Sequence, residues 1–393
     1  MRISKRCQGV SPSMTLAITS KAKALIKEGK DVVNFGVGEP DFNTPIHIRE
    51  AAKAAIDGGA TRYTPAAGTP ELKAAICKSF KERGLNYEAA QVVVSNGAKH
   101  SLFNAMQAIL DEGDEVILPA PYWVTYPELI KLSGAVPVIV PTDENLMLDM
   151  DAMKASITEK TKAIVINNPS NPTGAVYSTE LMKQVAELAI AHDLAVISDE
   201  IYDQLIYDGD APVSIATLPG MQERTIVING VSKTYAMTGW RIGWLAAPLP
   251  VAKAITALQS QCTSNPNAIA QVAAIEALTA SQESVISMRE AFKERRDYAV
   301  NRIKNMDGVS CPTPGGAFYI MLDVSDVYGK AYEGKKIESS MDFASTLLDE
   351  KLVATVPGIA FGADAFVRLS YAASMEDIQK GLDRIEKFVK AMQ

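Results

Sequence analysis

Lys233 and Arg241, eight residues apart, are the residues whose types and spacing best fit a chemical task. Lys233 follows a strongly apolar segment at 225–228, so we expect it on the loop where a strand ends. A lysine held there can lose water and part of its proton affinity, which makes its amine a candidate nucleophile toward a carbonyl carbon. The forked, permanently charged guanidinium of Arg241 suits a phosphate. The pair predicts a site for pyridoxal 5′-phosphate, an aldehyde that carries a phosphate, although each residue alone would equally fit a solvated surface charge.

Two further segments follow predicted strands and could hold other parts of such a cofactor. Residues 95–99 follow a valine-rich strand and open a helix that Ser95 or Asn96 could cap. Gly97 would let the backbone approach an anion at the helix N-terminus. Trp123, just after the next strand, could offer an aromatic face to a planar ring. An ordinary strand-to-helix turn and core packing are the alternative interpretations.

Side chains that could hold the cofactor ring follow two more strands. The loop at 167–174 contains two prolines and four turn-forming residues, so it is rigid and aims Asn171, whose amide could donate to a phenolate oxygen. Asp199 ends another strand, where a carboxylate is costly unless paired, and a protonated pyridine nitrogen would pair with it. Tyr202 could reach the same phenolate oxygen as Asn171. The alternatives are a stiff connector at 167–174 and a helix cap at Asp199.

Two further segments concern the binding of a substrate carboxylate and of a dinucleotide. Arg368 lies within an apolar strand, where a buried guanidinium needs a carboxylate. A substrate α-carboxylate is one candidate, and an internal Asp or Glu is the other. Residues 36–41 begin like the dinucleotide motif GxGxxG, but Pro40 and Asp41 replace its last positions and no strand-helix-strand unit surrounds it. We therefore reject a dinucleotide site.

The elements that must position these residues alternate between about residue 90 and residue 247. Seven short apolar segments are typical of strands: 91–94, 115–118, 137–140, 163–167, 195–198, 225–228 and 242–246. Amphipathic stretches such as 102–110 and 181–191 lie between them. This alternation predicts an α/β unit with a mostly parallel sheet covered on both faces. Ligand sites in such sheets lie beyond the carboxyl ends of the strands, where the motifs fall.

After this unit the pattern changes. Residues 284–306 indicate one long helix, and the following segments, including a strand at 352–356, indicate a smaller α+β unit. A strand-like segment at 32–35 in the N-terminal arm would join it. We therefore expect an arm at 1–45 that is part of the small domain, a large cofactor-binding domain at 46–285, and a small C-terminal domain at 286–393.

The composition narrows the classes of partner and compartment. The net charge is −7 and no basic block is present, which argues against nucleic acid as a partner. Three histidines leave little material for His-based catalytic or metal sites, and no apolar run approaches the length of a membrane span. We expect free thiols and a reducing, cytoplasmic setting, because the four cysteines are scattered without a CxxC pair.

In this order, the segments closely resemble the class I/II aminotransferases of fold type I. The resemblance runs from residues 36–42 to Arg368, through the motifs at 167–174, 198–202 and 232–243. Within the family the sequence is most similar to bacterial aspartate aminotransferases of subgroup Ib, on residues 62–68 and 120–127. The resemblance implies a three-layer fold with a mainly parallel seven-stranded sheet in the large domain and a smaller α+β domain that closes over the substrate. It also implies a homodimer with active sites at the subunit interface.

Matched position by position, the resemblance implies roles around the cofactor ring. Lys233 would form the internal aldimine and then move the proton between the α-carbon and C4′. Asp199 would pair with the pyridine nitrogen, and Asn171 and Tyr202 with the phenolate oxygen. Trp123 would stack on the ring.

The resemblance also implies how the phosphate is held. Many relatives carry a hydroxyl residue three positions before the lysine, but this chain has Gly230 there, and we do not assume that Ser232 replaces it. The partner subunit's Tyr63 would join the phosphate contacts. The contacts from the same subunit would come from Gly97, Ala98, Lys99 and Arg241.

For the substrate, the resemblance assigns the α-carboxylate to Arg368, with Gly38, Trp123 and Asn171 near it. The side-chain carboxylate of aspartate would be recognised by Lys99 and by two arm hydroxyls, Ser13 and Thr15.

Some subgroup members that accept prephenate carry a lysine where this chain has Ser11. We therefore expect aspartate and 2-oxoglutarate as substrates over prephenate. An aminotransferase of another specificity, a lyase, or a non-enzymatic homologue of the fold are the alternatives. A regulator of that last kind would carry an added DNA-binding domain, for which we expect no room because the arm starts at residue 1.

Overall fold

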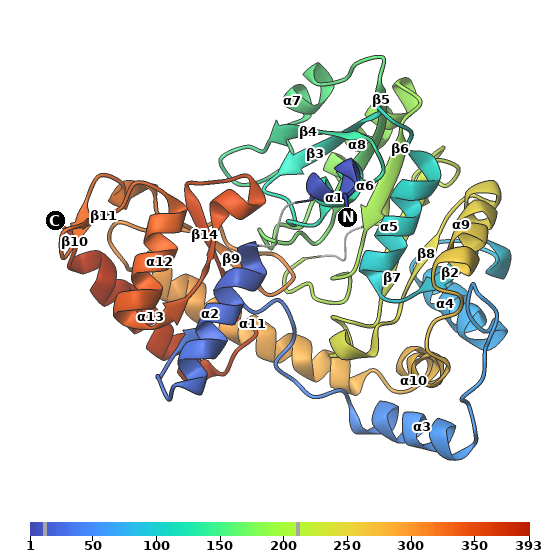
Figure 1. The fold of residues 1–393 in the computed structure, drawn as a ribbon, viewed down its shortest axis with the longest axis horizontal. Helices are drawn as coiled ribbons and strands as arrows, with labels where there is room; N and C mark the ends of the chain where they lie inside the picture. The colour runs from blue at the N-terminus through green and yellow to red at the C-terminus, as the bar shows by residue number, and fades with distance from the viewer. Residues whose placement is uncertain (11–13, 210–212) are drawn as a thin grey trace.

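The centre of the molecule is a twisted sheet that carries all the predicted strand-end motifs (Figure 1). The computed structural model describes residues 1–10, 14–209 and 213–393. The sheet consists of β2 (Val92–Ser95), β3 (Glu115–Ala120), β4 (Val136–Pro141), β5 (Thr161–Asn167), β6 (Ala195–Asp199), β7 (Thr225–Gly230) and β8 (Gly243–Ala246). Its order is β2-β8-β7-β6-β5-β3-β4, with β8 antiparallel to both neighbours and the other pairs parallel. The predicted mainly parallel seven-stranded sheet is confirmed.

Helices cover both faces of this sheet because its strands are apolar on both sides. In β7, Ile226 and Ile228 belong to the hydrophobic core of one face, and Val227 belongs to a core on the other. Successive side chains of a strand point to opposite faces, so an uninterrupted apolar run needs cover on both. The first face is covered by α5 (Ala98–Ile109), α6 (Tyr126–Leu132) and α9 (Leu249–Cys262). The second is covered by α4 (Pro70–Glu82), α7 (Met150–Ala155), α8 (Thr179–Ala191) and α10 (Ala268–Thr279), with α3 (Ile46–Asp57) packed on α10.

A second group of elements lies beside the sheet and is linked to it by the long helix α11 (Glu283–Lys304) (Figure 1). Its three-stranded antiparallel sheet has the order β13 (Val356–Pro357), β14 (Phe366–Ser370), β9 (Tyr319–Asp323). The group also contains α12 (Ser340–Lys351), α13 (Met375–Lys390) and the short pair β10 (Ala331–Tyr332) and β11 (Lys335–Lys336). The division of the chain at 45/46 and 285/286 stays a prediction.

The N-terminal arm contains α1 (Lys5–Gln8), α2 (Met14–Lys27) and β1 (Val33–Asn34). It joins this second group through α2 and β1, whereas α1 contacts α6 on the large sheet. β1 pairs in parallel with β12 (Val353–Ala354), and Lys21 of α2 forms an ion pair with Asp349 of α12. The single strand predicted at 352–356 is wrong, because this segment divides into β12 and β13, which pair with different partners.

The turn after β6 is packed between the two groups. Tyr202 and Leu205 of this turn are buried in the same hydrophobic cluster as Phe292 of α11 and Phe318. Within this cluster the ring of Tyr202 meets that of Phe318, with ring centroids 5.6 Å apart. The turn is therefore fixed by apolar packing on the side of the second group.

Two further features concern the chain as a whole. Its four cysteines are free thiols. Within the described ranges, no helix combines the length and the apolar character that a membrane crossing requires.

Candidate active site

Ten of the residues singled out from the sequence line one cavity of about 560 Å³. The cavity lies beyond the carboxyl ends of the parallel strands, because its residues follow β3, β5, β6 and β7 and begin α5. This is the edge where ligands of open α/β sheets bind. The ten are Gly38, Ala98, Lys99, Trp123, Asn171, Asp199, Tyr202, Lys233, Arg241 and Arg368.

The amine of Lys233 is held at the centre of the cavity by the N-terminal arm. Its Nζ donates a hydrogen bond to the carbonyl oxygen of Gly38 at 2.6 Å. Burial lowers the pKa of Lys233 to about 8, and the positive charges of Arg368 and Arg241 act in the same direction. A substantial fraction of this amine is therefore neutral, and able to attack a carbonyl carbon, at mildly alkaline pH.

The N-terminus of α5 and Arg241 together form an anion site. Gly97 is the residue before α5, with φ 88°, and a Cβ there would lie 2.4 Å from Nη2 of Arg241. Glycine is therefore required for the close approach. Arg241 is oriented by hydrogen bonds from its Nη1 and Nη2 to the carbonyl oxygens of Thr238 (2.9 Å) and Asn96 (3.3 Å).

The predicted cap of α5 by Ser95 or Asn96 is wrong. The hydroxyl of Ser95 donates to Oε1 of Gln259 at 2.7 Å instead, and no side chain caps α5. The first amides of a helix have no partner inside the helix. The amides of Gly97 and His100 donate to the carbonyl oxygens of Ser95 and Gly97. No side-chain cap uses the amides of Ala98 and Lys99, so these two donors stay available for an anion beside the Arg241 guanidinium.

Asp199 presents a buried carboxylate at the end of β6. It is 3% exposed; its Oδ2 accepts from the hydroxyl of Tyr126 at 2.8 Å and its Oδ1 from the backbone N–H of Ile201 at 3.2 Å. Burial raises the pKa of Asp199 to about 6, opposed by these two hydrogen bonds and reinforced by the charge of Glu200. The alternative that Asp199 caps a helix is wrong, because a turn follows β6.

Asn171 and Tyr202 both present polar groups to the cavity. The backbone N–H of Asn171 donates to Oδ1 of Asn167 at 2.8 Å, and its own Oδ1 accepts from Arg368 at 3.0 Å, which leaves the side-chain NH₂ free to donate to a ligand. The hydroxyl of Tyr202 lies 3.0 Å from that of Tyr319. Burial raises the pKa of Tyr202 well above its usual value, so the phenol keeps its proton.

Arg368 is a buried cation with no carboxylate partner in the described ranges. It is 3% exposed, its Nη2 donates to the carbonyl oxygen of Gly36 at 3.1 Å, and its Nε is buried without a hydrogen-bond partner. Its guanidinium carbon lies 4.4 Å from the ring centre of Tyr319 and 5.1 Å from that of Phe361. Of the two partners that the sequence left open, this environment favours an incoming carboxylate over an internal one.

Comparison with known proteins assigns the family over nearly the whole chain. A family model described as aminotransferase class I and II matches residues 30–385. This chain belongs to that family. An aspartate aminotransferase from Geobacillus stearothermophilus is 47% identical over 100% of both chains. An aspartate/prephenate aminotransferase from Cereibacter sphaeroides is 46% identical over 96% of each chain. The solved structure of the Thermus thermophilus aspartate aminotransferase with maleate is 42% identical, covers 99% of this chain and 100% of that one, and has a TM-score of 0.93.

The residues predicted to face the aminotransferase substrate are only partly brought together. The ring of Trp123 meets that of Tyr126 edge-on, with centroids 5.4 Å apart, and Nζ of Lys99 lies 4.8 Å from the Trp123 ring centre. Burial and the charge of Arg241 lower the pKa of Lys99. Tyr63 is 90% exposed and does not line the cavity.

The arm residues predicted for substrate specificity are not described at the level of side chains. Ser11 and Ser13 lie outside the described residues. Thr15 lies in the first turn of α2, and its side chain is likewise outside the description.

Sequence reasoning missed three residues of the aminotransferase cavity. Tyr126 donates to Asp199, Tyr319 contacts both Tyr202 and Arg368, and Lys23 of α2 lines the cavity from the arm. Tyr126 and Tyr319 lie inside apolar segments whose local pattern indicates only burial. Lys23 lies on a basic helix that the sequence does not distinguish from a solvated surface.

Proposed function

We propose that this aminotransferase uses pyridoxal 5′-phosphate to transfer the amino group of L-aspartate to 2-oxoglutarate, giving oxaloacetate and L-glutamate. The observation that carries the proposal is the convergence, in one cavity, of a lysine amine with a lowered pKa, a buried carboxylate and a helix N-terminus beside an arginine. These three features match an aldehyde, a pyridinium nitrogen and a phosphate.

The cofactor fits the donor set. Asp199 has no ion-pair partner in the described part of the chain, and a protonated pyridine nitrogen would supply the missing positive charge. Gly97 removes the one Cβ that would crowd Arg241, which keeps room for phosphate oxygens. Asn171 and Tyr202 would donate to the phenolate oxygen, and Trp123 would stack on the ring.

When bound, the cofactor withdraws electrons from the α-carbon of the amino acid and acidifies its proton. Lys233 is the base that takes this proton, because its amine is partly neutral and is held in the cavity by the Gly38 carbonyl. Arg368 and Asn171 hold the α-carboxylate, which fixes the direction in which the α-proton points. The Nη1 donor of Arg368 and the Oδ1 of Asn171 already contact each other, so the pair is oriented before substrate arrives.

Aspartate as the amino donor is supported by full-length relatives that are aspartate aminotransferases and by the cations of the cavity. The Thermus thermophilus protein was solved with maleate, itself a four-carbon dicarboxylate. In this chain Lys99, with Ser13 and Thr15, would recognise the second carboxylate. Some relatives are named aspartate/prephenate aminotransferases. The preference for aspartate over prephenate therefore depends on Ser11, at the position where a lysine accompanies prephenate use.

We further propose a cytoplasmic homodimer with shared active sites. Tyr63 is 90% exposed in the single chain, so its ring is accessible to a partner subunit. In the dimer, the partner subunit's Tyr63 would complete the phosphate site next to Arg241.

A half-reaction tests the proposal. The purified protein is loaded with pyridoxal 5′-phosphate, and the visible absorbance is followed after L-aspartate alone is added. We expect rapid loss of the yellow band with aspartate or glutamate, and much slower loss with alanine, phenylalanine and arogenate. A protein that binds the cofactor but responds faster to another amino acid would overturn the substrate, and a protein that cannot be loaded would overturn the cofactor.

A further inference from the structure

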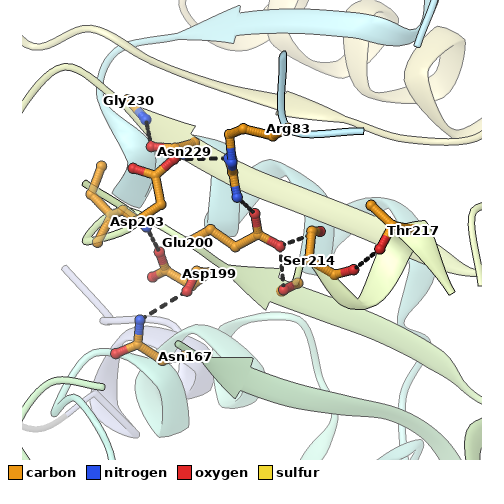
Figure 2. Close-up of polar contacts among 11 residues, drawn as sticks. Arg83, Asn167, Asp199, Glu200, Asp203, Ser214, Thr217, Asn229 and Gly230 are labelled. Atoms are coloured by element: carbon orange, nitrogen blue, oxygen red, sulfur yellow. Dashed lines mark hydrogen bonds and ion pairs between the residues drawn. The ribbon is translucent and has the colours of Figure 1, made fainter. Parts of the chain in front are cut away.

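A buried network of charges lies directly behind Asp199, on the side of β6 that faces away from the cavity (Figure 2). Glu200 follows Asp199 in the chain and is 3% exposed, but it does not line the cavity. Consecutive side chains at a strand end point to opposite sides, so the two carboxylates lie back to back. Asp199 is used by the proposed cofactor site, whereas Glu200 is not.

Arg83, at the C-terminal end of α4, joins two acids of the same turn. Its Nη2 lies 2.5 Å from Oε2 of Glu200, and its Nη1 lies 2.8 Å from Oδ2 of Asp203. Burial opposes the charge of Arg83, but the two carboxylates outweigh it and raise the pKa of Arg83. The guanidinium is therefore a permanent cation with a carboxylate on each branch of its fork.

The same two carboxylates also accept hydrogen bonds from neutral donors. Oε1 of Glu200 accepts from the hydroxyls of Ser198 (3.0 Å) and Ser214 (2.5 Å). Oδ2 of Asp203 accepts from Nδ2 of Asn229 at 3.0 Å (Figure 2). Because Asn229 belongs to β7 and Ser198 to β6, the network connects the turn to two strands of the sheet.

The clamped residues alternate with the residues that face the cavity. Glu200 and Asp203 are bound to Arg83. Asp199, just before Glu200, and Tyr202, just before Asp203, are the predicted ligands of the cofactor ring. The backbone of the same turn is closed by a hydrogen bond from the N–H of Asp203 to the carbonyl oxygen of Glu200 at 3.0 Å. Any movement of Glu200 or Asp203 would therefore move Asp199 and Tyr202 as well.

We propose that Arg83 is a positioning residue of the active site, which clamps the turn through Glu200 and Asp203 so that Asp199 and Tyr202 meet the cofactor ring. This inference rests on the proposed function of the cavity. Arg83 also balances the charge of Glu200, the carboxylate nearest in sequence to Asp199. The clamp therefore fixes the position of Asp199 and Tyr202 and also changes the electrostatic potential at Asp199. Substitutions of Arg83 separate these two effects.

The test compares Arg83→Gln and Arg83→Lys with wild-type holoenzyme. We expect Arg83→Gln to weaken pyridoxal 5′-phosphate binding about tenfold. The pH midpoint of the bound cofactor's visible absorbance should rise, because removing a cation favours protonation nearby. Arg83→Lys keeps the charge but cannot hold both acids in a fork, so its affinity should fall while its pH midpoint stays near that of wild type.

The matched control is Arg302→Gln. Arg302 also contacts two carboxylates, Asp383 at 2.7 Å and Glu386 at 3.0 Å, but it joins α11 to α13 outside the cavity. We expect Arg302→Gln to change the melting temperature and to leave the cofactor affinity and pH midpoint unchanged. A folded Arg83→Gln with wild-type affinity and midpoint would show a purely structural role and overturn the proposal.

Asp203→Asn keeps the proposal testable if Arg83→Gln does not fold. It removes one branch of the clamp and an anion instead of a cation, so its pH midpoint should move downward, opposite to that of Arg83→Gln. A midpoint that does not move would overturn the clamp. Wild-type protein that binds no pyridoxal 5′-phosphate would overturn the proposed function itself, and this measurement is made before any variant is compared.

Discussion

Arg83, whose side chain is 21% exposed, and the buried Arg368 differ in what they pair with. Arg83 contacts two carboxylates, Glu200 at 2.5 Å and Asp203 at 2.8 Å. Arg368 contacts the side-chain oxygen of Asn171 and a backbone carbonyl, and no ion pair joins it to an acid within the described ranges. Arg83 contacts the turn after β6 through Glu200 and Asp203, whereas Arg368 lines the cavity together with Asp199 and Tyr202 of that turn.

The difference distinguishes a charge that stabilises the folded chain from a charge that is available to bind a ligand. A buried charge is tolerated when an opposite charge accompanies it, and it is penalised until one arrives. The two carboxylates outweigh burial and raise the pKa of Arg83, whereas burial dominates at Arg368 and lowers its pKa. The charge of Arg83 is therefore neutralised within the folded chain, whereas the charge of Arg368 is neutralised by a ligand.

The largest expected effect comes from replacing each arginine by methionine, which keeps the length of the side chain and removes the charge. For Arg368→Met we expect kcat/KM for L-aspartate to fall about 10³-fold, because a buried charge pair with the substrate is lost. Its melting temperature without substrate should be unchanged or higher, since an unpaired buried cation is removed. Steady-state kinetics and thermal unfolding measure the two effects.

Arg83→Met should show the opposite balance. It leaves two buried carboxylates without a counter-charge, so the free energy of unfolding should fall by about 3 to 5 kcal/mol. Chemical denaturation measures this loss. Equal losses of stability in Arg368→Met and Arg83→Met would contradict the distinction between the two arginines.

Asp199 extends the comparison to an acid, because no ion pair joins its carboxylate to a cation within the described ranges. Burial raises its pKa to about 6 from a usual value of 3.8. A carboxyl group with a raised pKa holds its proton more tightly in the folded state, so its ionisation destabilises the fold as the pH rises through this interval. For cofactor-free Asp199→Asn, we expect stability relative to wild type to increase by about 3 kcal/mol between about pH 4 and pH 7.

Denaturant titrations at the two pH values measure this difference, with Asp203→Asn as the matched control. Asp203 is paired with Arg83, so its replacement should reduce stability at pH 7. Bound cofactor should reverse the order for Asp199, because the wild-type carboxylate then gains its counter-charge. A stability difference for Asp199→Asn that is the same at both pH values would contradict the assignment.

The fold could be predicted from the sequence because its signals are local. Each strand of the central sheet is a short apolar run between turn-forming residues, and the helices between them repeat with helical spacing. The predicted ends were displaced by at most two residues, because the neighbouring strand, and not the apolar run, decides where pairing stops. At 352–356 this effect divided one predicted strand into two with separate partners.

The chemical groups of the site could be proposed from the sequence, but their partners could not. Three charged residues follow or occupy apolar segments, namely Lys233, Asp199 and Arg368. A charge in such a segment is costly unless it is paired, which indicates a function. The contact between Arg83 and Glu200 joins residues 117 positions apart, and no local pattern connects them. The cap of α5 was assigned wrongly to Ser95 or Asn96. The Ser95 hydroxyl donates its hydrogen bond to Gln259, a residue 164 positions away.

A smaller effect concerns a third arginine, Arg241, which contacts only backbone carbonyls and lies beside Gly97. Gly97 and Gly113 both have a positive φ, 88° and 89°, which alanine adopts only with strain. A Cβ at Gly97 would lie 2.4 Å from Arg241, whereas one at Gly113 would meet nothing within 4 Å. Each change to alanine should therefore destabilise the fold by about 1 to 2 kcal/mol through the backbone alone.

Only Gly97→Ala should also displace the guanidinium and weaken binding of inorganic phosphate, by about tenfold. Calorimetric titration of phosphate into each cofactor-free variant measures this, and Gly113→Ala corrects for the shared backbone strain. Equal phosphate affinity in the two variants would mean that Arg241 is not an anion ligand. A lower phosphate affinity in Gly97→Ala alone would support Arg241, like Arg368, as a cation whose charge a ligand neutralises.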